Sequence, residues 1–563
     1  MSAADWIVLC GFLAFVVIYG TWKTRGKKNI NEFLLAGRST PWYAVTLSIM
    51  ATQASAITFL STPGQAYVDG MRFVQFYLGL PIAMIILSMT AVPIFHRLNV
   101  YTAYEYLEQR FDLKNRVLGS VLFLIQRGLA AGFTILAPAL IFSVILGWDI
   151  QLTVIAIGSL VVIYTASGGT DAVSKTHLLQ MIIITFGMLT AFFMLLNLLP
   201  QDISLLDATR VAGKMGRLNA ITFDFDWRDR YNFWSGLIGG TFLALSYFGT
   251  DQSQVQRYLA GKSITQSRIG LLANGIVKIP MQFSILFLGA MVFVFYQFVT
   301  PPLIFNPVET KKVNNSVYNG EYSSLEDEYQ EIHSLKKEKL REMLKADENG
   351  NESEVSSSVN EVTEYTKKES EIRDKAHKLI RTADPGADTN DTNYIFLSFV
   401  ITYLPAGLIG LILASIFSAS MSSTSAELNA LASTTVIDVY KRLIKSDAAD
   451  RHYVMVSKLA TIFWGLYAVA FAIFANRLGS LIEAVNILGS LFYGTILGIF
   501  LIAFYFKNIG GTATFYSALF AEVVVLACYF FTEIPFLWYN VIGCSVLIMA
   551  AVILNLLFNK EGA

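Results

Sequence analysis

The sequence predicts an all-α polytopic membrane protein with about thirteen transmembrane helices. Its 563 residues are 54% hydrophobic and have a mean hydropathy of +0.52, so there is too little polar surface to cover a water-soluble protein of this length. Apolar runs long enough to cross about 30 Å of hydrocarbon recur along the chain. Lysine and arginine gather in alternate connections between these runs, which is typical of multi-pass proteins of the plasma (inner) membrane.

The first apolar run is predicted to be a retained helix, because its basic residues follow it and no small-residue cleavage site is present. With the N-terminus outside, the connections 23–41, 253–268 and 439–452 place their basic residues inside, as the positive-inside rule favours. An odd number of spans then leaves the C-terminus in the cytoplasm. The predicted spans are 4–22, 42–67, 73–97, 116–147, 152–169, 176–199, 233–252, 269–300, 395–438, 453–476, 479–506, 512–531 and 535–558.

The chain divides into three parts. Residues 1–300 hold spans one to eight, residues 301–392 form a polar external loop, and residues 393–563 hold spans nine to thirteen. The loop is rich in Glu, Lys, Ser and Asn and has almost no apolar clusters, so we expect it to bury no core. Acidic residues precede basic ones at helical spacing over 324–344, which predicts a solvent-exposed helix. A tolerated insertion is the plainest interpretation of this loop.

Composition and motifs argue against several other classes of protein. The chain has 42 Lys+Arg and 42 Asp+Glu, and this balance predicts no nucleic-acid partner. Cys10, Cys528 and Cys544 lie in apolar runs without a CxxC or histidine pairing, so neither a disulfide framework nor a zinc site is expected. The sequence shows no catalytic triad, metal cluster or phosphate loop, so an enzyme is not predicted. The sequence shows no ring-forming charged filter, so a channel is not predicted. Nothing in the sequence requires an oligomer.

The second predicted span has a polar patch near its middle, followed by a proline and a glycine. Ser55 and Thr58 lie in this patch, and Pro63 and Gly64 come one to two turns later. This pattern is typical of an interrupted helix, whose carbonyls are released from helical bonding and are free to coordinate a cation. The alternative is an unbroken helix in which the hydroxyls bond to the carbonyls of their own helix.

The ninth span carries a cluster of small polar residues. The hydroxyls of Ser422 and Ser423, together with the carbonyl of Ala419 one turn earlier, place several neutral oxygens in one region. Neutral oxygens suit a weakly held monovalent cation, whereas calcium or magnesium prefers carboxylates. Close packing between helices is the alternative interpretation of this cluster. The coincidence with a broken second span favours the ion site.

The seventh span is a second candidate for a discontinuous helix. It combines glycines at 239 and 240 with Ser246 and Tyr247 near its middle, and it ends in the acidic motif at Asp251. Because spans two and seven are five apart, spans 2–6 and 7–11 are predicted to form two five-helix repeats of opposite topology, each opening with a broken helix. Binding sites in such proteins lie between the repeats.

Six motifs of the chain lie at 33–38, 51–59, 102–111, 164–169, 251–259 and 422–429. Together they resemble the sodium:solute symporter family, and the resemblance covers nearly the whole chain except 301–392. It implies a LeuT-like inverted-repeat core with accessory helices, placed in a lipid bilayer, that imports a small organic solute by alternating access down the sodium gradient. Some members of this family are fused to a histidine kinase, but we expect no such sensor here, because only five residues follow the last span.

The resemblance also implies a site for the sodium ion. Carried over by position, its ligands are the carbonyls of Ala51, Ala54 and Ala419 and the hydroxyls of Ser422 and Ser423, the same region that neutral-oxygen chemistry indicates. This set predicts one bound cation.

A second sodium site is expected to be degenerate, so that one sodium ion moves per cycle. His177 stands where family members with two sodium ions have an aspartate. Ser425 is retained, but Ala426 replaces a further hydroxyl. His177 is interpreted either as a neutral, hydrogen-bonded helix residue or as a protonatable group coupled to transport.

The solute is less well defined than the cation. By the same resemblance, Tyr247 matches an inner-gate tyrosine, Thr58 a solute contact, and Arg127 the arginine that holds a carboxylate. A buried arginine needs a partner, which is either an anionic solute or a carbonyl or acid on a neighbouring helix. We therefore expect a monocarboxylate or sugar acid, with a neutral sugar or polyol as the alternative. Further candidates for the solute pocket are Arg72, Gln75, Phe76, Glu483 and Asn486.

Overall fold

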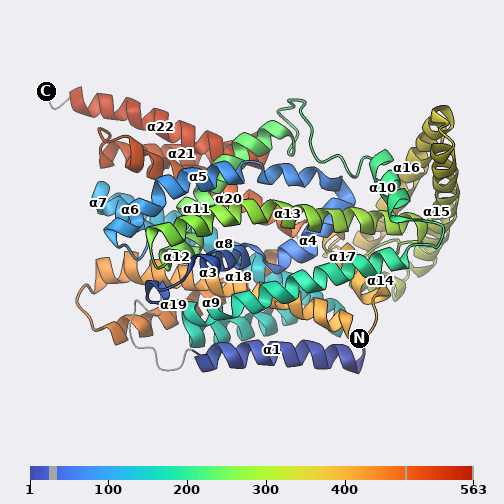
Figure 1. The fold of residues 1–563 in the computed structure, drawn as a ribbon, viewed down its shortest axis with the longest axis horizontal. Coiled ribbons are helices and arrows are strands. Elements are labelled where there is room, and N and C mark those ends of the chain that lie inside the picture. Colours follow the sequence, from blue (N-terminus) through green and yellow to red (C-terminus); the bar gives the residue numbers. More distant parts are fainter. Residues whose placement is uncertain (24–34, 476–478, 561–563) are drawn as a thin grey trace.

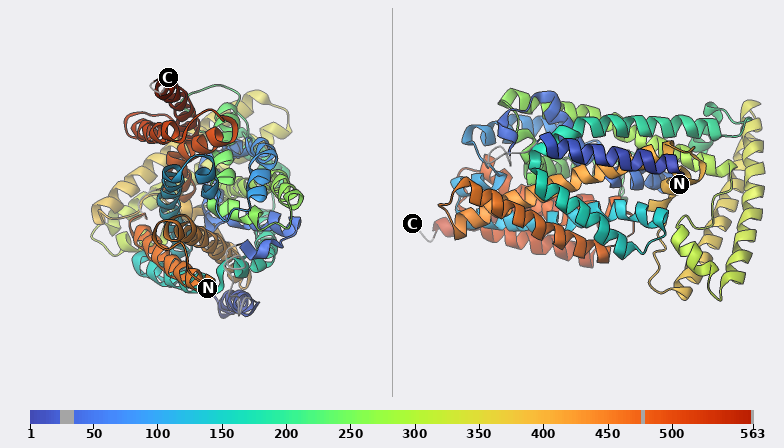
Figure 2. Two further views of the ribbon diagram at one scale, coloured as in Figure 1. Left: turned by 90° about the vertical axis from the view of Figure 1, so that its left-hand side faces the viewer. Right: turned by 90° about the horizontal axis from the view of Figure 1, so that it is seen from below.

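The computed structural model describes residues 1–23, 35–475 and 479–560, apart from some side chains, including those of 167–179. The described residues form helices and no strand, with one isolated β-bridge between Thr40 and Gly261. Most helices run along one long axis and form a bundle (Figure 1). Viewed along that axis, the bundle is several helices across in both directions (Figure 2). A single large cluster of buried apolar side chains extends through it.

The first half of the bundle follows the order of the predicted spans. Helix α1 precedes the first broken helix, and α9 takes in both predicted spans 152–169 and 176–199. The elements are α1 (Ala3–Lys23), η1 (Ala36–Arg38), α3 (Trp42–Gln53), α4 (Ala56–Asp69), η2 (Gly70–Tyr77), α5 (Leu80–Met89), α6 (Ala91–Leu98), α7 (Ala103–Arg110), α8 (Leu113–Leu146) and α9 (Ile150–Leu198).

The second half repeats the device of a broken helix and then adds two C-terminal helices. Its elements are α10 (Leu205–Lys214), η3 (Ser235–Gly239), α11 (Gly240–Gly249), α12 (Gln252–Leu259), α13 (Ile264–Phe298), α14 (Pro307–Asn314), α15 (Asn319–Glu348), α16 (Glu352–Ala383), α17 (Thr392–Tyr403), α18 (Leu408–Thr434), η4 (Thr435–Ile444), α19 (Asp450–Ala475), α20 (Leu481–Tyr505), α21 (Gly511–Phe531) and α22 (Phe536–Lys560).

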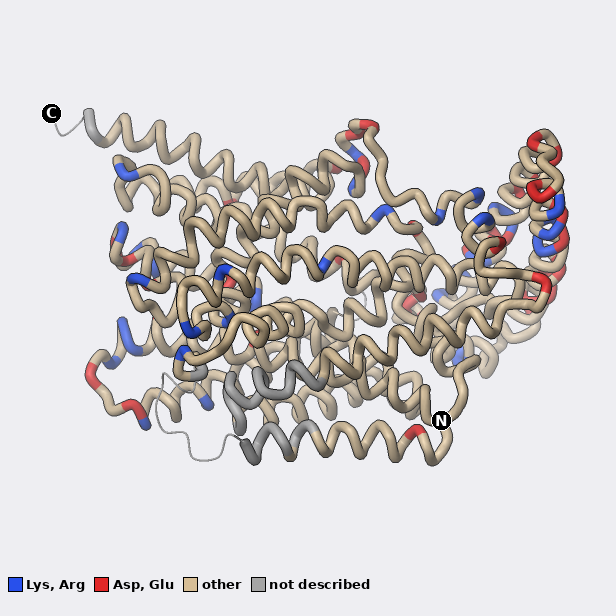
Figure 3. Tube along the Cα trace, in the orientation of Figure 1, with Lys and Arg blue, Asp and Glu red and all other residues tan. Residues whose placement is uncertain are grey.

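The bundle has the charge distribution of a multi-pass membrane protein. Nine described segments are long and apolar enough to span a membrane, and three shorter apolar helices accompany them. Charged residues gather at the two ends of the bundle and leave a largely uncharged middle (Figure 3). Helix α1 begins at one end and α22 ends at the other (Figure 1), as an odd number of crossings requires. The count of thirteen and the side that faces the cytoplasm stay predictions.

The second predicted span is interrupted, as the sequence indicates, close to Ala51 and Ala54 and ahead of Pro63. Helix α3 ends at Gln53 and α4 begins at Ala56, so the break lies at Ala54 and Ser55. Pro63 and Gly64 lie inside α4. Gly64 serves packing instead, because a Cβ there would lie 2.0 Å from the carbonyl oxygen of Thr392 at the start of α17.

The seventh span is also interrupted. Helix α11 ends at Gly249, and α12 begins at Gln252 with the carboxylate of Asp251 as its N-cap, accepting a hydrogen bond from the Ser253 amide. The two broken helices therefore stand five predicted spans apart. The predicted ninth span, 395–438, is wrong as a single helix. Leu404 to Gly407 separate α17 from α18, where Pro405 supplies no amide proton and Gly407 adopts a φ of 88°.

Residues 301–392 do bury a core, so the expectation that they cannot is wrong. Helices α15 and α16 form a hairpin, hereafter the outer hairpin, that stands across the ends of the membrane helices (Figures 1 and 2). The predicted helix 324–344 lies within α15. Few apolar residues suffice because they recur at helical spacing on the facing sides of both helices. Those buried between them and their neighbours include Tyr322, Tyr329, Ile372, Ala376, Leu379 and Ile380.

Candidate functional site

The break in the second span exposes backbone oxygens to a neighbouring helix. Helix α18 packs against both α3 and α4. In an unbroken helix the Ala51 carbonyl would accept from the amide of residue 55. Here it accepts a hydrogen bond from the hydroxyl of Ser423 on α18, at 3.4 Å. Both groups are buried, so water does not compete for them.

The neighbouring hydroxyls are suited to a cation. The Ser422 Oγ is buried and has no hydrogen-bond partner among the described residues. Buried polar groups are ordinarily hydrogen-bonded, so this hydroxyl, on the residue next to Ser423, is available to a cation. Ala54, whose amide still bonds to Met50, lies in the break, and its carbonyl is released because the Thr58 amide bonds to the Ser55 carbonyl instead. These neutral oxygens fit sodium better than a divalent cation.

A central cavity of about 130 Å³ lies between the two broken helices. Thr58 on α4, Phe76 on η2, Tyr247 on α11 and Asn486 on α20 line it, and so does Arg127 on α8. The structure therefore brings together five of the eight residues that the sequence analysis names for the solute pocket. Polar groups from several helices converge with aromatic rings there, as in small-molecule sites generally.

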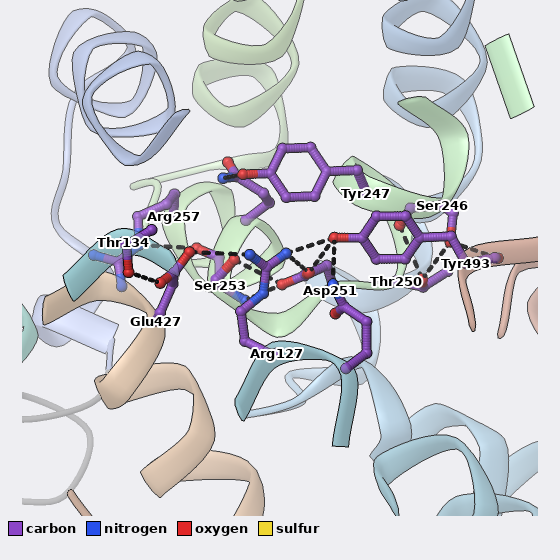
Figure 4. A network of polar contacts seen from close by, with 12 residues as sticks. Arg127, Thr134, Ser246, Tyr247, Thr250, Asp251, Ser253, Arg257, Glu427 and Tyr493 are labelled. Atoms are coloured by element: carbon purple, nitrogen blue, oxygen red, sulfur yellow. Dashed lines mark hydrogen bonds and ion pairs between the residues drawn. The ribbon is translucent and has the colours of Figure 1, made fainter. Parts of the chain in front are cut away.

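Arg127 is held by two carboxylates from other helices. Its guanidinium donates to Glu427 on α18 at 3.0 Å and forms a second ion pair with Asp251 at the break between α11 and α12. The hydroxyl of Tyr493 joins both Arg127 and Asp251. Figure 4 shows the guanidinium between the two acids, with the Tyr247 ring nearby. Of the two partners left open by the sequence, acids on neighbouring helices satisfy Arg127 in this structure.

A second network lies next to the cavity-lining residues Phe76 and Ile482 in the chain, and we call it the outer cap. Arg230 donates to the Glu483 carboxylate at 3.0 Å, and the Tyr231 hydroxyl donates to the same group at 3.0 Å. Arg72 forms an ion pair with Asp229. The cap thus joins the connection that precedes η3 to η2 and to the start of α20. Arg72 and Glu483, both candidates for the solute pocket, belong to this cap and do not line the central cavity.

Three further predicted residues are Gln75, His177 and Ser425. Gln75 does not line the central cavity, because its amide donates to the Tyr231 carbonyl at 2.7 Å and accepts from the Thr222 amide. His177 lies outside the residues whose side chains are described. Ser425 is buried, 2.7 Å from the Thr165 hydroxyl. The roles predicted for these residues in solute or second-sodium binding stay predictions.

Lys278 is a lining residue that sequence reasoning missed. It lies on α13, is only 2% exposed and borders the central cavity. Its ammonium lies 5.8 Å from the centre of the Tyr77 ring. No hydrogen bond or carboxylate for this ammonium is found within the described part of the chain. The signal was a single lysine within the apolar run 269–300, since an ionisable residue inside a membrane span points to function.

Two interrupted helices around a central cavity, with released carbonyls at one break, define a membrane carrier of the inverted-repeat class. The model of the sodium:solute symporter family matches residues 33–319 and 378–521. This is well over half of the chain, so the protein belongs to the sodium:solute symporter family. The unmatched gap falls within the outer hairpin.

The relatives include animal and bacterial carriers. The sodium/iodide cotransporter of Homo sapiens is 33% identical over 50% of this chain and 43% of the relative. The sodium-coupled monocarboxylate transporter 1 of Xenopus laevis is 27% identical over 86% of this chain and 65% of the relative. The sodium/sialic acid symporter of Proteus mirabilis (strain HI4320) is 25% identical over 98% of this chain and 95% of the relative. The chain thus spans less than two thirds of these two animal relatives.

A solved structure supports the predicted fold. The substrate-bound, outward-open structure of a Na⁺-coupled sialic acid symporter matches this chain with a TM-score of 0.74 at 23% identity. The match covers 99% of this chain and 98% of that one. The LeuT-like fold expected from the sequence is confirmed by this likeness.

Proposed function

We propose that the chain is a sodium-coupled symporter that imports a small organic solute by alternating access, with one sodium ion per cycle. The observation that carries the proposal is the meeting of the Ala51 carbonyl with Ser423 beside the orphaned hydroxyl of Ser422. A sodium ion there would tie the broken helix to α18 and favour one arrangement of the two repeats. Coupling requires only that ion and solute prefer the same conformation. A membrane potential adds about 2.3 kcal/mol per charge per 100 mV.

We propose further that the solute is an organic carboxylate, such as a monocarboxylate or a sugar acid. The charge of Arg127 is already balanced by Asp251 and Glu427, and only its Nε is without a hydrogen-bond partner among the described residues. Lys278 has no such partner among the described residues, and burying an unpaired cation is costly. A solute carboxylate beside Lys278 removes that cost. Two relatives are named for monocarboxylate and sialic acid, which agrees with this chemistry.

Uptake into proteoliposomes tests both steps. With an inward sodium gradient, we expect saturable uptake of radiolabelled pyruvate as the carboxylate probe, little uptake of galactose, and none when choline replaces sodium. Lys278→Gln should lower pyruvate uptake at least about tenfold, because a hydrogen bond to a charged group contributes about 1.5–3 kcal/mol. The matched control is Lys262→Gln, which changes an exposed lysine outside the cavity.

The opposite pattern would support the neutral-solute alternative. Sodium-driven galactose or mannitol uptake that survives Lys278→Gln, without pyruvate uptake, would remove the carboxylate proposal. Thr58 and Asn486 would then supply the neutral polar contacts that the cavity offers. Uptake that does not saturate would contradict a carrier of either kind.

A further inference from the structure

A second cavity, of about 510 Å³, lies beneath the outer hairpin and apart from the central cavity. On one side it is lined by Lys336 of α15 and by Arg373 and His377 of α16. On the other side it is lined by Tyr67 at the end of α4 and by Phe293 of α13. The family model does not match 320–377, the stretch that supplies Lys336, Arg373 and His377 to this wall.

The hairpin is anchored over this cavity by ion pairs rather than hanging free. Arg341 of α15 pairs with Asp202 at 2.9 Å, and Lys214 of α10 pairs with Asp347 at 3.3 Å. Arg373 pairs with Asp391 at 2.7 Å where the chain re-enters the bundle. The outer hairpin is therefore attached to the bundle on the side of the cavity that it covers.

Positive charge exceeds negative charge in the cavity wall. Four cationic side chains line it, and only two carboxylates face them. Glu369 forms an ion pair with Lys336, and Asp391 forms one with Arg373. The other two cations, Arg217 and Arg381, form no ion pair among the described residues, and the nearby charges of Asp69 and Asp388 act on them only from farther away. They donate to neutral oxygens, the carbonyl of Val68 and the hydroxyl of Thr389.

Unused donors and aromatic rings complete the wall. The Nε of Arg217 and the Nε2 of His377 are buried, and neither has a hydrogen-bond partner among the described residues. Burial lowers the pKa of His377 below its ordinary value, so at neutral pH this ring presents a neutral nitrogen. The Arg217 guanidinium lies 4.4 Å from the centre of the Phe293 ring, which places charge and aromatic surface side by side. A carboxylate on an apolar body matches that combination.

We propose that the cavity beneath the outer hairpin is a binding site for an organic carboxylate that enters from solution at the hairpin end. The site uses Arg217 and Arg381 as the charge partners of the carboxylate and the rings of Tyr67 and Phe293 for its apolar body. The inference is independent of the proposed transport function. Helix α4 reaches from Thr58 in the central cavity to Tyr67 in this one, so an occupant would contact the outer end of the broken helix.

Calorimetric titration of the purified full chain tests the site, with benzoate as the probe. In sodium-free choline buffer at constant ionic strength, we expect saturable benzoate binding, and none by the neutral benzyl alcohol. Arg381→Gln should raise the dissociation constant by up to about fivefold, since a charge pair with an exposed side chain contributes about 0.2–1 kcal/mol. Arg381→Lys should restore much of the affinity. Arg381 is exposed and donates to one hydroxyl, so its replacement leaves the fold intact.

Three further variants keep the site separate from the transport pathway. Arg228→Gln removes an exposed arginine outside the cavity and should leave benzoate binding unchanged. Lys278→Gln and Ser423→Ala alter the central cavity and the proposed sodium site, and both should bind benzoate as the wild type does. Equal affinity in the wild type and Arg381→Gln, loss of binding in Lys278→Gln, or no binding by the wild type would overturn the proposal. None of these results depends on uptake.

Discussion

The hydroxyl of Ser423 on α18 donates to the carbonyl of Ala51, 3.4 Å away, one turn before the second span breaks. Ser423 lies 372 residues further along the chain. The contact is formed only because α18 crosses the break itself. A continuous helix would have used this carbonyl internally.

Ser423→Ala removes this hydroxyl and is expected to abolish sodium-driven uptake in proteoliposomes or to raise the sodium concentration for half-maximal uptake by at least about tenfold. The physical reason is the loss of one direct oxygen ligand, since a hydrogen bond or ligand to a charged group contributes about 1.5–3 kcal/mol. Ser433→Ala is the matched control on the same helix, because the Ser433 hydroxyl bonds to the Ala430 carbonyl. Unchanged sodium dependence in Ser423→Ala would count against the site.

Arg127→Gln leaves the carboxylates of Asp251 and Glu427 buried without a cation. We expect a loss of stability of about 3–5 kcal/mol, the usual effect of breaking a buried ion pair from one side. Asp251→Asn should have a smaller effect, because Arg127 keeps Glu427. Thermal unfolding of the detergent-solubilised chain measures the order. A stability of Arg127→Gln equal to that of the wild type would mean that the network is not formed.

Glu483→Gln weakens the outer cap by removing the partner of Arg230 and a charged acceptor of Tyr231. The Arg230 side chain is 58% exposed, so the pair contributes only about 0.2–1 kcal/mol. We therefore expect a rise of up to about fivefold in the reactivity of Phe76→Cys toward a water-soluble maleimide. Arg228→Gln in the same background is the control. A slower reaction than in the unchanged cap would show that the network does not cover the cavity.

The outer hairpin should lose stability as pH falls. Burial lowers the pKa of His333 below its ordinary 6.5 and acts in the same direction on His377. The unfolded hairpin therefore binds protons first, and stability declines from about pH 6.5 downward. Burial alone would raise the pKa of Glu369, but hydrogen bonding from His333 and the charge of Lys336 lower it below 4.5. The stability supplied by Glu369 is present above pH 4.5 and is lost as pH falls further.

Hydrogen exchange measures this dependence. After correction for intrinsic rates, the amides of α15 and α16 should exchange faster at pH 5 than at pH 7.5, while those of α18 should not. His333→Gln should flatten the part of the profile between pH 7 and 5. A hairpin equally protected at both pH values would contradict the assignment of buried, neutral histidines.

Sequence reasoning predicted the broken helices because small polar residues inside a membrane span have few other uses. It named the carbonyls of Ala51 and Ala54 as released, and the helix breaks at Ala54 and Ser55. Pro63, which was part of the predictive pattern, lies inside α4. The partners of Arg127 could not be read from spacing, because Asp251 and Glu427 lie 124 and 300 residues away. The core of the outer hairpin was missed because its apolar residues are sparse in each helix and suffice only in combination.

Direct binding of radioactive sodium to the purified chain is the most direct test of the central claim, that main-chain oxygens at a helix break and two serines on α18 hold one cation. The account predicts saturable binding of one sodium ion per chain in the wild type. It predicts no saturable binding in the folded double variant Ser422→Ala/Ser423→Ala. Undiminished sodium binding by that double variant would contradict it.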